Sequence, residues 1–183
     1  MTPLALIRHG PTRWNEEKRL QGQTDVPLSS DGHDKVARWS VPEEFVAYDW
    51  VASPMTRAMQ TAEHLGLSVT PEPTIVEMHW GDWEGFTGDE LRAKYGDEFQ
   101  HRADLGLDLR PHGGESPRDV LTRVHGWIRD SVAKGPATGA VCHQGIIRAA
   151  LSLATGWEMV GPPPHEMDWA SVHLFAVDDD GNV

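Results

Sequence analysis

Short apolar runs that end abruptly in polar or turn-forming residues are the feature that most constrains the fold of this chain. Residues 4–7, 50–52 and 140–142 are such runs, and amphipathic segments separate them. This alternation is typical of α/β proteins, in which helices cover both faces of a mostly parallel sheet. We therefore expect an α/β fold built as a three-layer α/β/α sandwich.

Further elements are expected between these runs. Residues 74–77 and 172–177 are candidate strands, and residues 116–134 have the apolar periodicity of a long helix. Ser53, which is followed by Pro54, is expected to cap a helix that extends to about residue 65. The remaining expected helices cover residues 30–39, capped by Ser29 or Ser30, and residues 146–154.

Length and composition limit the organisation and the partners of the chain. Its 183 residues suggest one domain over residues 1–183, with an inserted, mostly helical segment at about 78–115 that covers the pocket. The 28 acidic side chains against 16 basic ones argue against a nucleic acid or an anionic membrane as partner. A single cysteine, Cys142, and the lack of a signal-peptide pattern favour the cytoplasm. A small molecule is the expected partner.

Residues able to do chemistry follow the expected strands directly. Arg8 and His9 follow the first run, Arg57 lies one turn into the helix after the second, and His143 follows residues 140–142. Glu77 ends the candidate strand 74–77. The carboxyl ends of parallel strands meet at one edge of a sheet, where helix N-termini add amide donors. Two histidines, two arginines and one carboxylate at that edge suit a phosphate group.

Five ordered sequence blocks resemble the signature of the histidine phosphatase superfamily, the phosphoglycerate-mutase-like group. The resemblance extends from residue 4 to about 151 and rests on the blocks Leu6-Ile7-Arg8-His9-Gly10, Arg19 to Gly32, Ser53 to Ala62, Glu77 to Gly85, and Gly114-Glu115-Ser116 with His143, Gly145 and Arg148.

The resemblance implies a role for each matching residue. His9 would be the nucleophile that becomes phosphohistidine, its other ring nitrogen donating to a backbone carbonyl. Arg8, Arg57 and His143 would hold the phosphoryl oxygens, and Glu77 would protonate the leaving oxygen and then activate water. No metal or other cofactor is implied. The substrate-binding residues would be Asn15, Gln21, Gly22 and Gln144.

Two departures and the branch of the family bear on the reaction. Pro11 stands where Glu or Gln is usual, and Gln144 where Gly is common; both are expected to tune the pocket. Residues 77–85 and the short chain resemble the phosphatase branch, so hydrolysis of a small phosphate monoester is expected. A sugar phosphate and the ribazole phosphate of cobalamin assembly are candidate substrates. A cofactor-dependent phosphoglycerate mutase and a non-catalytic phosphate-binding module are the alternatives.

Other residues offer competing assignments. Cys142 to Arg148 fits C-x-x-G-x-x-R, the phosphate loop of cysteine-dependent phosphatases, although Val141 and Ala149 depart from that pattern. Glu84 and Glu115 compete with Glu77 for the acid's role. The remaining histidines lack metal-ligand spacing, and His79 is expected at the rim of the pocket. Two tryptophans are expected to contact the non-phosphate part of a substrate, Trp80 and Trp83.

Overall fold

A five-stranded sheet with the order β3-β2-β4-β1-β5 forms the centre of the computed structural model, which describes residues 1–183. β4 pairs in parallel with both β1 and β2, and β2 pairs in parallel with β3. Only the edge strand β5 runs antiparallel, along β1. The strands are β1 (Thr2–Arg8), β2 (Asp49–Ala52), β3 (Thr70–Pro71), β4 (Thr138–Cys142) and β5 (His173–Val177).

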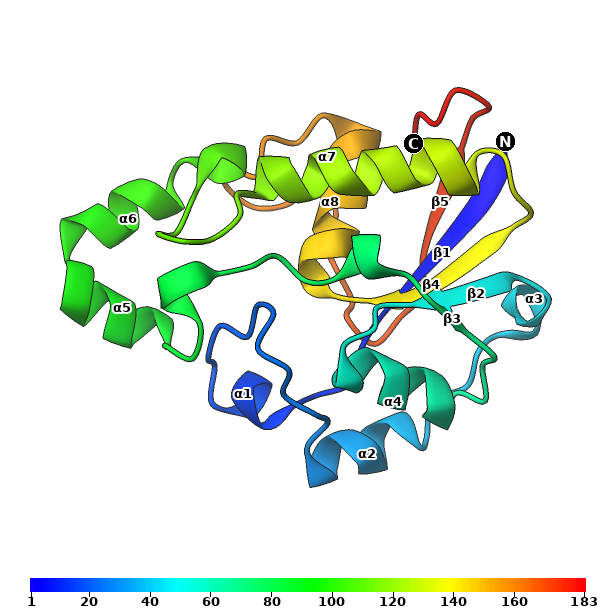
Figure 1. The fold of residues 1–183 in the computed structure, drawn as a ribbon, viewed down its shortest axis with the longest axis horizontal. Coiled ribbons are helices and arrows are strands. Elements are labelled where there is room, and N and C mark those ends of the chain that lie inside the picture. The colour runs from blue at the N-terminus through cyan, green and yellow to red at the C-terminus, as the bar shows by residue number, and fades with distance from the viewer.

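Helices cover both faces of this sheet, which confirms the expected α/β/α sandwich. α7 and α8 pack together on one face, while α2 and α4 lie on the other (Figure 1). No helix has the length and apolar character needed to cross a bilayer. The α-helices are α1 (Arg13–Glu16), α2 (Ser30–Val36), α3 (Glu43–Val46), α4 (Thr56–His64), α5 (Gly88–Tyr95), α6 (Asp97–Ala103), α7 (Pro117–Trp127) and α8 (Gln144–Thr155).

The two cores follow from the alternation of side chains along the central strands. Leu4 and Leu6 of β1 face the α7 and α8 side, where they join a cluster of 17 buried residues. Ala5 and Ile7 point to the opposite face, into a cluster of eight. On that side Ala58 presents a small side chain to the sheet, so α4 approaches the strands closely.

The expected strand at residues 74–77 is wrong. The chain there forms a short 3-10 helix, η1 (Pro73–Ile75), and the edge strand β3 lies just before it. Proline cannot donate to a strand ladder and its fixed φ suits the start of a helix, so Pro73 ends the pairing. The Glu72 carboxylate accepts the Thr74 N–H at 2.8 Å and caps the turn.

The expected Ser53 cap is also wrong. α4 begins at Thr56, and the side chain of its N-cap residue, Met55, makes no capping bond. Instead, the Asp25 carboxylate accepts both the N–H and the hydroxyl of Thr56, at 2.9 and 2.6 Å. An acidic side chain from a distant loop therefore compensates the positive end of α4.

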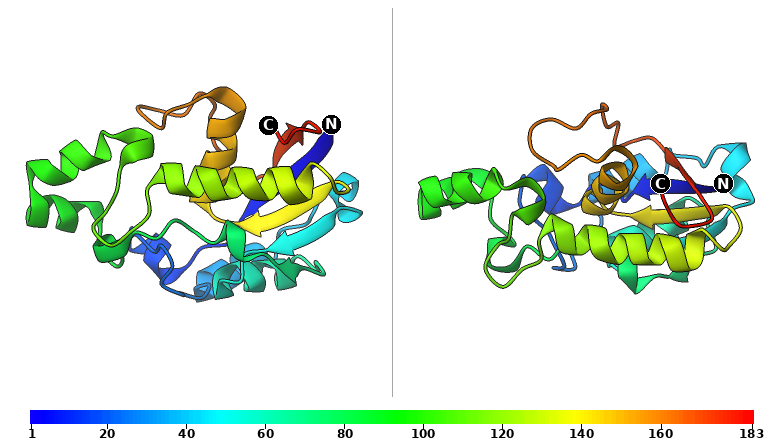
Figure 2. Two further views of the ribbon diagram at one scale, coloured as in Figure 1. Left: turned by 45° about the horizontal axis from the view of Figure 1, so that its top comes forward. Right: turned by 90° about the horizontal axis from the view of Figure 1, so that it is seen from above.

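The segment between residues 78 and 115 contains α5, α6 and two 3-10 helices, η2 (Gly81–Trp83) and η3 (Gly106–Asp108). α5 and α6 lie beyond the sheet, at the end where α7 begins (Figure 2). The long helix expected over residues 116–134 is present as α7 and the π-helix η4 (Ile128–Val132) that continues it.

The approach of β2 to β4 depends on the absence of a side chain at Gly139. It is paired with Trp50, and a Cβ at this position would lie 2.4 Å from the indole. We expect Gly139→Ala to lower the free energy of unfolding by about 1–3 kcal/mol, because the buried indole must move. Gly126→Ala, in α7, is the matched control: nothing lies within 4 Å of its added Cβ, so it should stabilise by about 0.5–1 kcal/mol. Urea unfolding measures both, and equal effects would contradict the packing described here.

Candidate active site

The register between β1 and β4 brings two histidines together. Arg8 is paired with Cys142 in the parallel ladder, so the next residue of each strand lies beside the other. These residues are His9 and His143, whose ring centroids are 5.1 Å apart in an edge-to-face arrangement. The His9 N–H donates to the Cys142 carbonyl at 2.9 Å, which continues the ladder by one further bond.

A backbone carbonyl determines the tautomer of His9. Its Nδ1 lies 2.7 Å from the Gly10 carbonyl oxygen, and a carbonyl can only accept, so Nδ1 carries the proton. The lone pair is then on Nε2, as expected for a nucleophile. Burial and the nearby Arg57 lower the pKa of His9 to about 3, so the imidazole is neutral at physiological pH.

A threonine connects the loop that follows His9 to α4. The Gly10 N–H donates to the Thr61 hydroxyl at 2.9 Å, and this hydroxyl donates to the Arg57 carbonyl at 2.7 Å. His9 and Arg57 therefore belong to one hydrogen-bonded unit, although they are far apart in sequence.

Arg57 and Arg8 are cations without a carboxylate partner. The fully buried Arg57 donates from Nη2 to the Gly22 carbonyl at 2.7 Å and from Nη1 to the Thr24 carbonyl at 3.1 Å. Arg8 stacks on the ring of Trp169 at 5.2 Å. The Nε atoms of both arginines are buried and have no partner. Desolvation by burial lowers the pKa of each, yet guanidinium stays charged, so both favour an anion beside His9.

His143 is completely buried behind His9. Its Nε2 lies 2.7 Å from the Ser53 hydroxyl, while its Nδ1 has no partner. This contact explains why Ser53 does not cap α4. Burial, followed by the electrostatic effect of His9 and Arg57, holds the pKa of His143 well below its ordinary range.

The Glu77 carboxylate lies at the N-terminus of α8. One oxygen accepts the Met78 N–H at 2.8 Å and the other the Gly145 N–H at 3.2 Å. A Cβ on Gly145 would lie 2.2 Å from the carboxylate oxygen, so glycine is required there for this approach. The Glu77 carbonyl accepts from Gln23 and Arg123, which fix the backbone at this point.

The two competing carboxylates have structural partners instead. Glu84 accepts the N–H groups of Gln23 and Thr24, each at 2.9 Å, and so closes the loop that carries them. Glu115 forms an ion pair with Arg123 at 3.1 Å. Neither Glu84 nor Glu115 lines the cavity described next, whereas Glu77 does.

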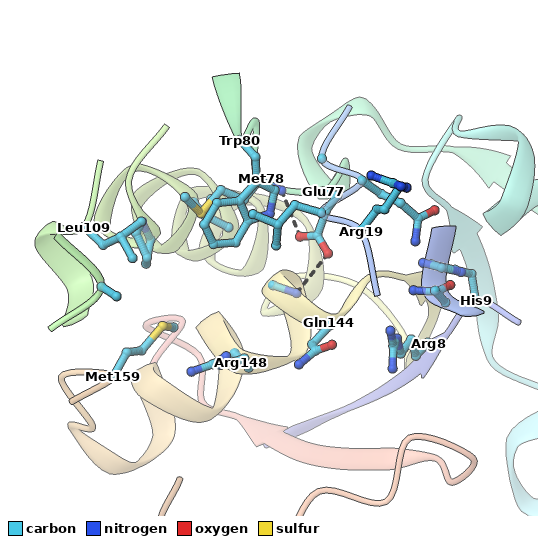
Figure 3. Close-up of a pocket in the computed structure, with 18 of the residues that line it drawn as sticks. Arg8, His9, Arg19, Glu77, Met78, Trp80, Leu109, Gln144, Arg148 and Met159 are labelled. Carbon is cyan, nitrogen blue, oxygen red and sulfur yellow. Dashed lines mark hydrogen bonds between the residues drawn. The ribbon is translucent and has the colours of Figure 1, made fainter. Parts of the chain in front are cut away.

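A cavity of about 400 Å³ opens at the carboxyl ends of the strands, lined on one side by His9 and on the opposite side by apolar residues (Figure 3). It brings together eight of the nine residues predicted from the sequence; His143 is the exception, since it contacts His9 from behind. The eight are Arg8, His9, Asn15, Gln21, Gly22, Arg57, Glu77 and Gln144.

Asn15 and Gln21 are both held by Thr12. The Thr12 hydroxyl donates to the Gln21 side-chain oxygen at 2.8 Å, and the Thr12 backbone N–H donates to the Asn15 side-chain oxygen at 3.0 Å. In both side-chain amides the oxygen accepts a hydrogen bond from Thr12, so the NH₂ groups remain available to donate to a ligand.

Other lining residues were missed or misplaced by the sequence reasoning. Arg19 and Arg148 line the cavity; both occur in the family-like blocks, but the sequence indicated no role for them. His79, expected at the rim, does not line it and instead lies 3.7 Å from Glu84. Trp80 lines the cavity as expected, whereas Trp83 is buried and stacks behind it.

The cysteine-phosphatase alternative is wrong. Cys142 is fully buried in the larger core cluster and does not line the cavity. Burial raises the pKa of its thiol far above the ordinary value, which opposes formation of a thiolate nucleophile. No group of three or more His, Cys, Asp or Glu side chains is arranged to hold a metal ion.

An α/β/α sandwich with two adjacent histidines beside unpaired arginines is typical of a histidine-dependent phosphatase. Comparison with known proteins identifies the family. The model of the histidine phosphatase superfamily (branch 1) matches residues 4–183. The chain belongs to this superfamily.

Particular relatives fall on both sides of the mutase–phosphatase division. A glucosyl-3-phosphoglycerate phosphatase of Mycobacterium tuberculosis is 36% identical over 167 residues, 82% of this chain and 74% of that protein. A 2,3-bisphosphoglycerate-dependent phosphoglycerate mutase of Azorhizobium caulinodans is 28% identical, covering 98% of this chain and 94% of its own. The solved structure of a mycobacterial glucosyl-3-phosphoglycerate phosphatase in complex with VO3 superimposes with a TM-score of 0.78 at 29% identity, covering 96% and 93% of the two chains.

The neutral, buried histidines make stability depend on pH. Unfolded histidines titrate near pH 6.5, so below that pH the unfolded chain binds protons that folded His9 and His143 do not. The free energy of unfolding should therefore fall on acidification, by up to about 1.4 kcal/mol per pH unit for each histidine. For His9 this loss continues down to about pH 3.

Urea unfolding between pH 7 and pH 5 measures this slope. We expect His143→Gln to have a shallower slope than the wild type, because one of the two groups no longer takes up a proton on unfolding. Replacement of the exposed His101 by Gln is the control and should leave the slope unchanged. Parallel curves for His143→Gln and the wild type would show that His143 is not neutral in the folded protein.

Proposed function

We propose that the chain is a phosphate monoester hydrolase that acts on a small phosphorylated metabolite through phosphohistidine. The observation that carries this proposal is the neutral His9, whose Nδ1–H is held by the Gly10 carbonyl at the wall of the cavity. Its Nε2 is thereby available to attack phosphorus beside two cations that lack anionic partners, Arg8 and Arg57.

In the first half-reaction, His9 Nε2 forms a bond to phosphorus while the bond from phosphorus to the ester oxygen breaks. The Arg8 and Arg57 guanidinium groups bind the phosphoryl oxygens and stabilise their negative charge, and the His143 ring packs against the ring of His9. The Gly10 carbonyl stabilises the proton on Nδ1 as the ring becomes cationic.

Glu77 acts on the leaving oxygen. As a carboxylic acid it donates a proton to that oxygen, and as a carboxylate it then takes a proton from the water that attacks phosphohistidine. At the N-terminus of α8 the Gly145 N–H holds this carboxylate in position for both half-reactions. Asn15, Gln21, Gly22 and Gln144 surround the phosphate and the adjoining part of the substrate.

The arginines supply the positive charge that a metal ion provides in other phosphoryl-transfer enzymes, so the proposed reaction needs no cofactor. The segment of residues 78–115 forms part of the pocket cover, through Met78, Trp80 and Leu109. We place the enzyme in the cytoplasm, without a nucleic-acid or membrane partner, on the basis of its acidic composition and single cysteine.

A phosphoglycerate mutase is the second candidate, because relatives with that name align with nearly the whole chain. Both reactions begin with phosphohistidine and differ in whether water or a second substrate accepts the phosphoryl group. Incubation with 3-phosphoglycerate, with and without 2,3-bisphosphoglycerate, separates them: release of inorganic phosphate supports hydrolysis, and interconversion to 2-phosphoglycerate supports the mutase.

Hydrolysis of p-nitrophenyl phosphate in excess EDTA tests the nucleophile. We expect the wild type to keep its activity in EDTA, and His9→Ala to lose more than about a thousandfold, because no other side chain offers a neutral nitrogen at that position. Cys142→Ser should stay within a few-fold of the wild type, since the thiol lies outside the cavity. The opposite pattern would restore the cysteine mechanism. Phosphate binding without turnover of any ester would indicate a binding module.

Glu77→Gln tests the acid by comparing leaving groups. p-Nitrophenolate leaves without protonation, whereas an alkoxide needs a proton, so kcat/KM should fall further for glycerol 3-phosphate than for p-nitrophenyl phosphate. The loss for the alkyl ester is expected to be about a hundredfold or more. Glu63→Gln, an exposed position on α4, should leave the ratio of the two esters unchanged. Equal losses for both esters would assign the leaving-group proton to another residue.

A further inference from the structure

The end of the cavity away from His9 contains an arginine that the proposed mechanism does not use. Arg148 lies on α8 four residues after Gln144, so the two are one turn apart, roughly 6 Å along the helix axis. Figure 3 shows Arg148 on the same side of the cavity as Gln144, next to Met159 and far from His9. Arg148 therefore lies beyond the phosphoryl group that His9 and Arg8 would bind.

The Arg148 guanidinium has no anionic partner and no hydrogen bond within the chain, in contrast with Arg19, which also lines the cavity. Arg19 donates to the Glu17 carboxylate at 2.8 Å and to the Glu90 carboxylate at 2.9 Å. Arg148 instead stacks on the ring of Trp157 at 5.0 Å. Stacking covers one face of the guanidinium and orients it, while leaving its N–H groups free for a planar acceptor.

The charges around Arg148 favour an anion from outside the chain. Burial lowers the pKa of Arg148, but guanidinium remains protonated at any physiological pH, so a partly desolvated cation is present. Glu77 is the carboxylate that faces the cavity, and it already accepts two backbone N–H groups. The other residues at this end are apolar and supply no counter-charge: Met78, Trp80, Leu109, Val120 and Met159.

We propose that Arg148 binds a second anionic group of the substrate, a carboxylate or a second phosphoryl group, at the opposite end from the ester that His9 attacks. This inference rests on the proposed hydrolase function and specifies its substrate class. The preferred substrates are phosphate monoesters that have a second oxyanion, joined to the ester by a short body that contacts the apolar wall. Bidentate binding to Arg148 then determines which ester is hydrolysed.

Two nearly isosteric esters test this assignment, 4-carboxyphenyl phosphate and 4-carbamoylphenyl phosphate. Each releases a para-substituted phenol and the two have nearly the same shape, but they differ in one negative charge. We expect the wild type to favour the acid over the amide at least tenfold in kcat/KM. Arg148→Gln should reduce this preference to less than threefold, and Arg148→Lys should retain part of it. Arg129→Gln removes an exposed arginine that pairs with Asp130, and should keep the wild-type ratio.

1,4-Phenylene bisphosphate separates the two kinds of anion, because a higher kcat/KM for it than for the carboxylate identifies a second phosphoryl group as the better ligand. Equal rates for acid and amide in the wild type, or an unchanged preference in Arg148→Gln, would overturn the inference. Loss of the preference in Arg129→Gln would also overturn it, since the effect would then be one of overall charge.

A binding measurement keeps this inference distinct from the proposed function. If the wild type hydrolyses none of these esters, the proposed function fails, and calorimetric titration of the acid and the amide into His9→Ala still tests Arg148. Tighter binding of the acid by at least fivefold, abolished by the additional Arg148→Gln substitution, supports the site. Equal affinities for the two compounds overturn it.

Discussion

The parallel pairing of β1 with β4 is the constraint on which the rest of the site depends. Because Arg8 is opposite Cys142, the two histidines that follow are forced side by side at the point where the sheet ends. Each then uses a different local partner, the Gly10 carbonyl for His9 and the Ser53 hydroxyl for His143. A shift of one residue in this register would separate the His9 and His143 rings from their present neighbours. It would also move the side chains of β1 from one face of the sheet to the other.

Charge is distributed unequally between the surface and the cavity. The chain as a whole has a net charge of −12, yet its cavity is lined by four arginines and one glutamate. Three of these arginines have no carboxylate partner: Arg8, Arg57 and Arg148. Burying unpaired cations destabilises the folded state, and the cost is offset only when an anion binds. The positive charges of the site are therefore in place before any anion binds, which is the arrangement that electrostatic preorganisation requires.

The sequence predicted the sheet and the residues around His9 well because strand ends carry strong local signals. An apolar run that ends just before Arg8 or His143 indicates a strand, and it places the polar residue at the carboxyl end of that strand. The sequence predicted residues 74–77 poorly because Pro73 and the Glu72 cap favour a 3-10 turn there over a strand, and it predicted Ser53 poorly because that residue depends on a long-range contact. Ser53 resembles a helix cap in sequence, but its hydroxyl is used by His143, which is 90 residues away in the chain. The partnerless state of Arg148 likewise cannot be read from a sequence, because it is a property of everything packed around it.

The two tryptophans that stack on pocket arginines belong to one connecting stretch, residues 156–172, between α8 and β5. Trp157 supports Arg148 at one end of the cavity, and Trp169 supports Arg8 at the other. This stretch contributes no strand to the sheet and no member to the histidine pair. Replacement of Trp157 would therefore alter how the cavity binds ligands at the Arg148 end while leaving Arg8 and the histidine pair in place, whereas replacement of Trp169 would also remove the support of Arg8. Substitutions in the loop around Trp157 can therefore change which ligands the cavity selects without changing the sheet or the two histidines.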